Sequence, residues 1–109
     1  MQLPPNDAIR ELATVLGEDA AREIVRLFLE DFPVSMDRLG GSGSLDQHRI
    51  AHGLKSSALH MGAAALSERM AAIEQRLSLP GERISPGEIA AVQADFDAVA
   101  PALRQYAAG

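Results

Sequence analysis

The 109-residue chain contains no cysteine and no tryptophan, and its aromatic side chains are three phenylalanines and one tyrosine. Without cysteine, neither a disulfide framework nor a thiolate metal site is possible. No apolar run approaches the roughly 20 residues that cross a membrane. The first residues also lack the basic start and continuous apolar stretch of a signal peptide. We therefore expect a cytoplasmic protein without a membrane partner.

Basic residues are in the minority, because 10 Lys and Arg stand against 15 Asp and Glu, a formal net charge of −5. Such a field repels a phosphate backbone, so nucleic acid is not an expected partner. The sequence also lacks a Gly-rich nucleotide loop, a Ser/His/Asp arrangement and a carboxylate pair. We therefore expect no ATP-dependent kinase activity and no enzyme of those classes.

Alanine and leucine are abundant, which favours helices over sheets and predicts an all-α fold. Apolar residues at helical spacing predict a short helix from about residue 7 to 16, capped by Asn6 or Asp7. Longer helices are predicted at 19–32, 46–61 and 66–77, and a last one begins after Ser85.

Prolines, glycines and caps set the expected helix ends. Pro33 should kink the second helix or make it restart, and Pro101 should bend or end the last. The Gly/Ser run at 40–44 is an expected connector, with Ser44 or Asp46 as the cap of the next helix. Ser85, Pro86 and Glu88 form a capping-box pattern.

These elements predict one domain over residues 1–109, an antiparallel up-down four-helix bundle with a short additional N-terminal helix. The inward face of the second helix should carry Ile24, Leu27, Phe28 and Phe32. Each helix has one apolar stripe that the bundle can bury, so we expect a monomer.

The stretch "AHGLKSSALHMGAAAL", residues 51–66, raises the question of function because it places His52 in a helix of small and apolar residues. The core positions Ile50, Leu54, Ala58 and Met61 fall within about 80° of arc, and His52 lies roughly 160° from their centre. The imidazole should therefore face solvent. Lys55, Ser56, Leu59 and His48 lie on the same outer side.

Three interpretations of this face remain open. Exposed histidines are common, and the face can simply be solvated. His48 and His52, four residues apart, could share a metal, but neither has a Glu three residues before it, so we expect no metal site. A helical adaptor could use the same face only to bind a partner.

Two features favour chemistry at His52. Gly53 costs roughly 1 kcal/mol of helix stability relative to Ala, which is unexpected on a helix face that has no function. A neutral imidazole is a good nucleophile toward phosphorus, and Lys55, one turn away, could offset the charge of a phosphoryl group. Leu59, apolar among polar neighbours, is a candidate docking contact, as are His48 and Gly53.

The stretch "AHGLKSSALHMGA" resembles the signature of histidine-containing phosphotransfer (Hpt) domains. In that signature a His is followed by any residue, Leu, Lys, Gly, two small residues and, further on, a Gly. The matching positions are His52, Leu54, Lys55, Ser57, Ala58 and Gly62. The segments "LFLEDFPVSMDRL" and "ALSERMAAIEQRL" are similar to the helices that flank the active one, so the resemblance spans nearly the whole chain.

The resemblance implies that His52 takes a phosphoryl group from the aspartate of a response-regulator receiver domain, or of a hybrid histidine kinase, and passes it to another receiver. Lys55 would steady that group. The Mg²⁺ that this transfer needs is held by the receiver, so no cofactor is expected here.

The chain departs from the family pattern at Ser56, where the family usually has Gly. A polar residue on the neighbouring helix often hydrogen-bonds the active imidazole, and counting along the chain places Glu74 there. A carboxylate that accepts from Nδ1 would leave Nε2 as the nucleophile.

Overall fold

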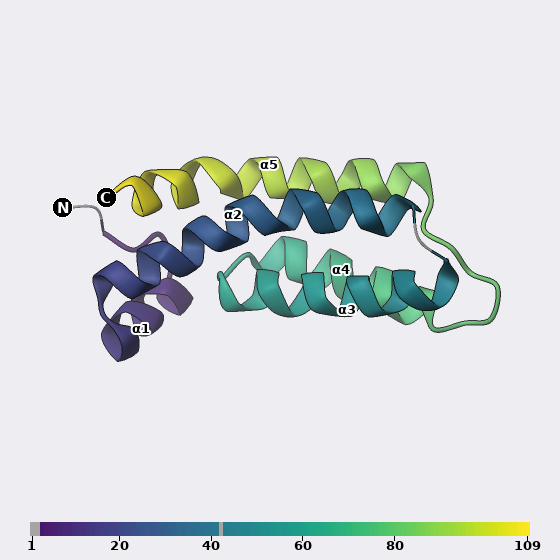
Figure 1. Cartoon of the computed structure of the whole chain (residues 1–109), viewed down its shortest axis with the longest axis horizontal. Helices are drawn as coiled ribbons and strands as arrows, with labels where there is room; N and C mark the ends of the chain where they lie inside the picture. Colours follow the sequence, from purple (N-terminus) through teal and green to yellow (C-terminus); the bar gives the residue numbers. More distant parts are fainter. Residues whose placement is uncertain (1–2, 42) are drawn as a thin grey trace.

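The computed structural model describes residues 3–41 and 43–109, and this part of the chain contains five helices and no strand. The helices are α1 (Asp7–Leu16), α2 (Glu18–Gly41), α3 (Ser44–His60), α4 (Ala64–Leu77) and α5 (Pro86–Ala108). The last four alternate in direction along one long axis, and α1 lies beside the start of α2 (Figure 1). The predicted all-α, up-down bundle with an additional N-terminal helix is confirmed.

The four long helices form a closed ring in which α2 contacts α3 and α5, and α4 also contacts α3 and α5. The pair α3 and α4 is the most closely packed of these. α2 and α5 are longer than α3 and α4, and α1 contacts the part of α2 that extends past them (Figure 1). The molecule measures 48 × 22 × 19 Å.

All three phenylalanines lie together between α2 and α5. Phe32 and Phe96 are stacked with ring centroids 4.9 Å apart, and Phe28 lies 5.3 Å from Phe32 and 5.9 Å from Phe96. Met36, Met61 and Met70 are buried in the core, where Met61 was expected. The aromatic cluster and the buried aliphatic side chains around it supply the apolar burial that stabilises the bundle.

The end of α3 and the start of α1 are locked together. Asn6 is the N-cap of α1, as expected, and its side chain accepts from the backbone N–H of Ile9. The same carboxamide donates to the carbonyl oxygen of Met61 over 2.8 Å. Gly62 turns the chain from α3 toward α4 with φ +71°, and a Cβ there would collide with Asn6. This contact therefore requires glycine.

The turn between α4 and α5 is held from two directions. Ser85 caps α5 and Glu88 completes the reciprocal capping box, as predicted. Arg76 of α4 pairs with Glu88 and with Glu82 of the turn. The buried side chain of Gln47 on α3 accepts from the backbone N–H of Ile84 over 2.9 Å. The turn after α4 is thereby fixed against α3.

Neither helix ends at its proline, so the expected restart after Pro33 and the expected end at Pro101 were wrong, whereas a kink in α2 and a bend in α5 stay predictions. α2 continues through Pro33 to Gly41, and α5 continues through Pro101 to Ala108. A proline removes one helical hydrogen bond, but buried side chains lie on both sides of each proline and hold the helix against the bundle. These are Phe32, Met36 and Leu39 in α2 and Ala100, Leu103 and Tyr106 in α5.

The connector and cap before α3 also differ from expectation. Gly40 and Gly41 belong to α2, and Ser42 lies outside the described residues. Gly43 is the N-cap, so α3 begins at Ser44 and the expected cap by Ser44 or Asp46 was wrong. Asp46 instead lies in the first turn and pairs with Arg49 over 3.0 Å. An acidic residue there favours the helix dipole without capping it.

Three positions expected in the core lie at or beyond its edge, and Ile24 of α2 is one of them, since it is half-buried. Leu27 is exposed, because it lies about 100° round α2 from Phe28. Ile50 is half-buried, and the innermost positions of α3 are instead Gln47 and Ala51, together with Leu54, Ala58 and Met61 as predicted. The buried face of α3 is therefore turned slightly from the expected one, and His52 remains on the far side of it.

Candidate functional site

His52 lies in the middle of α3, with its side chain 60% exposed. The helix presents it outward because residues one position earlier and two positions later, Ala51 and Leu54, are buried against the other helices. A fixed helix on one side and open solvent on the other give the imidazole a defined position and an accessible face.

α4 brings a carboxylate to this imidazole. The two helices pack closely, and both carry small side chains that are buried, among them Ala51, Ala58 and Ser67. The Ser67 hydroxyl donates to the carbonyl oxygen of Lys55 over 3.3 Å, which fixes the register of α4 against α3. Glu74 lies two turns further along α4, where it reaches the outward face of α3.

Glu74 contacts two residues of α3 at once. Its Oε1 lies 2.6 Å from Nδ1 of His52, and its Oε2 lies 2.6 Å from Nζ of Lys55. The Glu74 side chain is only 14% exposed, and that of Lys55 is 30% exposed. A carboxylate accepts but cannot donate, so Nδ1 of the neutral imidazole carries the proton and Nε2 carries the lone pair.

The ion pair also fixes the charge of Glu74. The hydrogen bond from Lys55 lowers the pKa of Glu74 below its ordinary value of 4.5, and the hydrogen bond with His52 acts in the same direction, against partial burial. The carboxylate is therefore ionised at neutral pH. It can stabilise positive charge that develops on the imidazole.

An Hpt domain family model matches residues 23–102, which is most of the chain. The chain belongs to the Hpt domain family. Hpt domains carry phosphoryl groups on histidine in phosphorelays and interact with receiver domains; they are phosphoryl carriers and not kinases. No curated protein and no solved structure matches the chain at a significant level.

The other residues singled out in the sequence of this Hpt domain lie around His52 on α3. Ser56 is half-buried one turn after it, and His48 is half-buried one turn before it. Gly53 is exposed beside it. The structure thus brings His52, Lys55 and Glu74 into direct contact, while these three residues border that contact.

Leu59 lies two turns beyond His52 and is 62% exposed. It borders a shallow groove against the apolar side chains of α1, which are Ala8, Leu12, Val15 and Leu16. Val15 and Leu16 are exposed as well. The sequence did not indicate that α1 extends the apolar surface near Leu59, because the partial burial of Leu12 and Ala13 against α2 fixes the rotation of α1.

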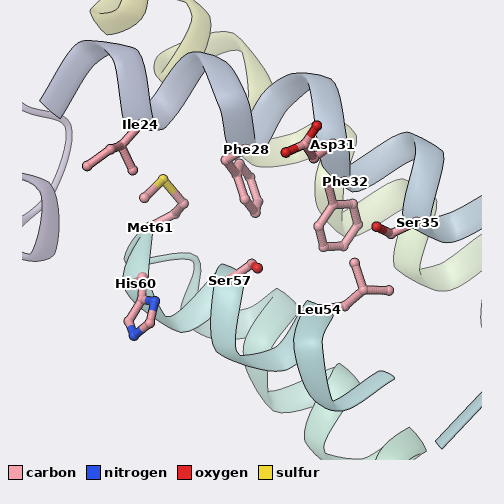
Figure 2. A pocket seen from close by; sticks show the side chains of 9 residues that line it. All are labelled: Ile24, Phe28, Asp31, Phe32, Ser35, Leu54, Ser57, His60 and Met61. Carbon is pink, nitrogen blue, oxygen red and sulfur yellow. The ribbon is translucent and has the colours of Figure 1, made fainter. Parts of the chain in front are cut away.

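His60 does not join His52. It borders a pocket of about 210 Å³ between α2 and α3 (Figure 2). Phe28 and Leu54 face this pocket from opposite helices, and Asp31 of α2 and Ser57 of α3 also line it. Among residues 3–41 and 43–109, no three His, Asp or Glu side chains are grouped as a metal site would require.

Sequence reasoning missed a second cation on the outer face of α3. Arg49 lies three residues before His52, as Lys55 lies three after it, and its side chain is 76% exposed. Its partner Asp46 is also well exposed, and such surface pairs contribute little energy. The spacing of three on both sides of the histidine was the signal that would have indicated it.

The described part of the Hpt domain also contains no helix that is long and apolar enough to cross a bilayer.

Proposed function

We propose that Nε2 of His52 accepts a phosphoryl group from the phosphorylated aspartate of a receiver domain and passes it to a second receiver. The observation that carries this proposal is the contact of Nδ1 with Glu74, over 2.6 Å, on an imidazole that is otherwise open to solvent. One ring nitrogen is occupied and the other is free, which is the state that a nucleophilic histidine needs.

The transfer step balances without any further reactant. The Nε2 lone pair attacks phosphorus, the P–O bond to the receiver aspartate breaks, and the aspartate leaves as a carboxylate. The ring gains positive charge as the N–P bond forms, and the ionised carboxylate of Glu74 lies against the protonated Nδ1. Transfer to the second receiver reverses these events. Phosphoryl transfer depends mainly on placement and charge, which this arrangement can supply.

Lys55 has the role of a local counter-charge. Its ammonium lies one turn after His52 and is held by Glu74, so it remains near the imidazole before the phosphoryl group arrives. Arg49 adds a second cation on the other side of the same face. Both offset a dianionic group that the formal net charge of −5 would otherwise disfavour.

The partner docks, on this proposal, on the surface around His52. Ser56 and His48 border the imidazole, and Leu59 together with the apolar side chains of α1 gives an apolar contact two turns away. The Mg²⁺ that assists transfer belongs to the receiver, and no metal or cofactor is assigned to this chain. The chain acts as a cytoplasmic, monomeric, single domain in this proposal.

The test uses the unaltered chain, a receiver domain charged with radiolabelled acetyl phosphate, and Mg²⁺. The unaltered chain should acquire a phosphate that is stable in base and labile in acid. A His52→Gln variant should still bind the receiver but acquire none, and the matched variant His60→Gln, also exposed on α3, should behave as the unaltered chain. A helical adaptor would bind the receiver and stay unlabelled in all three cases, which would refute the proposal.

A further inference from the structure

Gly53 has no structural role within the molecule. It lies in the interior of α3, where glycine costs helix stability relative to alanine, and it is exposed. Its φ is not positive. A Cβ built on it would meet no atom within 4 Å. Neither backbone conformation nor internal packing therefore calls for glycine at the position next to His52.

The surroundings of His52 differ on its two sides. Toward α4 the imidazole meets the side chains of Glu74 and Lys55. Toward α2 the next residue is Gly53, which borders a groove between α2 and α3. Ser57, one turn further along α3, and Ser35 of α2 also line this groove, and both face the space between the two helices (Figure 2).

The orientation of the ring matches this asymmetry. Nδ1 is directed at Glu74 of α4, and the two nitrogens lie on opposite sides of the imidazole ring. Nε2 therefore faces away from the Glu74 carboxylate. The open side of the site and the reactive nitrogen are both turned away from the wall that α4 forms.

We propose that Gly53 determines how closely a receiver domain can approach His52, because the receiver main chain passes over Gly53 from the side of the α2–α3 groove. This inference rests on the proposed function and adds to it the direction of approach and a specificity-determining residue. The family signature accepts any residue at this position, so the constraint belongs to the receiver of this chain: a side chain at position 53 would stand between that receiver's backbone and the imidazole, and it would lengthen the distance from Nε2 to phosphorus. The exposed side chain of Arg49 lines the same groove as Gly53, so it provides a positive charge toward the acidic site of a receiver.

The test compares Gly53→Ala and Gly53→Leu with the matched variants Gly41→Ala and Gly41→Leu. Gly41 is also helical and exposed with nothing within 4 Å of its Cβ, but it lies at the end of α2. Gly53→Ala should raise the Tm by roughly 4 to 8 °C, because a helix-interior glycine is removed without a collision. The measured quantity is the rate of transfer from a charged receiver that phosphorylates the unaltered chain.

Transfer should fall roughly 10-fold in Gly53→Ala and further in Gly53→Leu, as steric overpacking of a close contact predicts. The Gly41 variants should keep the rate of the unaltered chain. Phosphoramidate, a small donor without a protein backbone, should phosphorylate His52 in all variants at similar rates. A loss with the receiver but not with phosphoramidate assigns the effect to approach of the partner.

Unchanged receiver transfer in both Gly53 variants would overturn this inference and leave the proposed function intact. An equal loss with phosphoramidate would also overturn it, since the effect would then lie on the imidazole itself. If no charged receiver phosphorylates His52 of the unaltered chain, the proposed function fails and this inference fails with it.

Discussion

Glu74 Oε1 lies 2.6 Å from Nδ1 of His52, so a residue of α4 orients the imidazole of α3. The other oxygen of the same carboxylate lies 2.6 Å from Nζ of Lys55. One side chain thus selects the tautomer of the histidine and holds a cation beside it. The close packing of α3 and α4, together with the hydrogen bond from Ser67 to Lys55, makes this contact possible.

Replacing Glu74 with alanine should slow phosphoryl transfer by about 10- to 100-fold, because hydrogen bonds to charged groups contribute about 1.5 to 3 kcal/mol. Glu74→Gln keeps an acceptor for Nδ1 but removes the charge, so its rate of transfer should lie between that of the unaltered chain and that of Glu74→Ala. ¹⁵N NMR of the imidazole separates orientation from general damage. The unaltered chain should show mainly the tautomer protonated at Nδ1, and Glu74→Ala should shift the mixture. An unchanged tautomer ratio would contradict the assigned role.

Replacing Lys55 with methionine should raise the pKa of Glu74, because the Lys55 hydrogen bond is the largest cause of its lowered pKa. A ¹³C NMR titration of the Glu74 carboxyl group measures this directly. Transfer should slow about 10-fold, since a local cation no longer offsets the phosphoryl charge. Lys55→Arg keeps the charge and should recover part of the rate. A titration identical to that of the unaltered chain would show that the two groups do not interact in solution.

The contribution of Glu74 to the stability of the domain should be lost in acid. The folded state holds the pKa of Glu74 below 4.5, so its contribution to stability is complete above that pH and is lost as the pH falls through the lower, folded value. Thermal unfolding of the unaltered chain and of Glu74→Gln, followed by circular dichroism at several pH values, tests this. The Tm difference between them should shrink as the pH falls below 4.5. A difference that grows in acid would refute it.

The periodicity of the apolar residues was sufficient to predict the fold, because every long helix buries one stripe in a single ring of four. The helices do not end at Pro33 or Pro101, because buried side chains on either side of each proline offset the loss of one helical hydrogen bond. The predicted orientation of α3 about its own axis was slightly wrong, because Ile50 was expected in the core and is only half-buried. Ala51 and the polar Gln47 occupy the inner positions instead, and Gln47 is buried because it bonds Ile84.

The candidate site was only partly predictable. Helical spacing alone gave the outward position of His52, whereas Glu74 was placed beside it only through the family resemblance, because that contact depends on the register between two helices. The apolar surface near Leu59 depends on where α1 packs, and its own sequence does not specify that. Contacts between elements are tertiary properties, so periodicity within one element cannot supply them.

Replacing Leu59 with serine should weaken receiver binding at least about 10-fold, close to what burial of a leucine side chain contributes. Its exposure predicts little change in Tm. Leu79→Ser is the matched control, because Leu79 is similarly exposed, at 56%, but lies in the turn after α4. Isothermal titration with a receiver measures both. Equal losses in the two variants would show that Leu59 has no particular part in docking.

Replacing Gly62 with alanine should destabilise the domain by about 2 to 4 kcal/mol, the opposite sign from Gly53→Ala. Gly62 has φ +71°, and a Cβ there would strike the Asn6 carboxamide that caps α1 and bonds Met61. Urea unfolding measures the loss.

The variant Asn6→Ala separates the two causes of that loss, since it removes the collision but leaves the backbone strain. If the collision matters, Gly62→Ala should cost less in the Asn6→Ala background than alone, and strictly additive losses would assign the whole cost to φ. The same contact links stability to docking, because Asn6 holds α1 beside the end of α3 where Leu59 lies. Gly62→Ala should therefore weaken receiver binding as Leu59→Ser does, while phosphoramidate still labels His52 in the folded fraction.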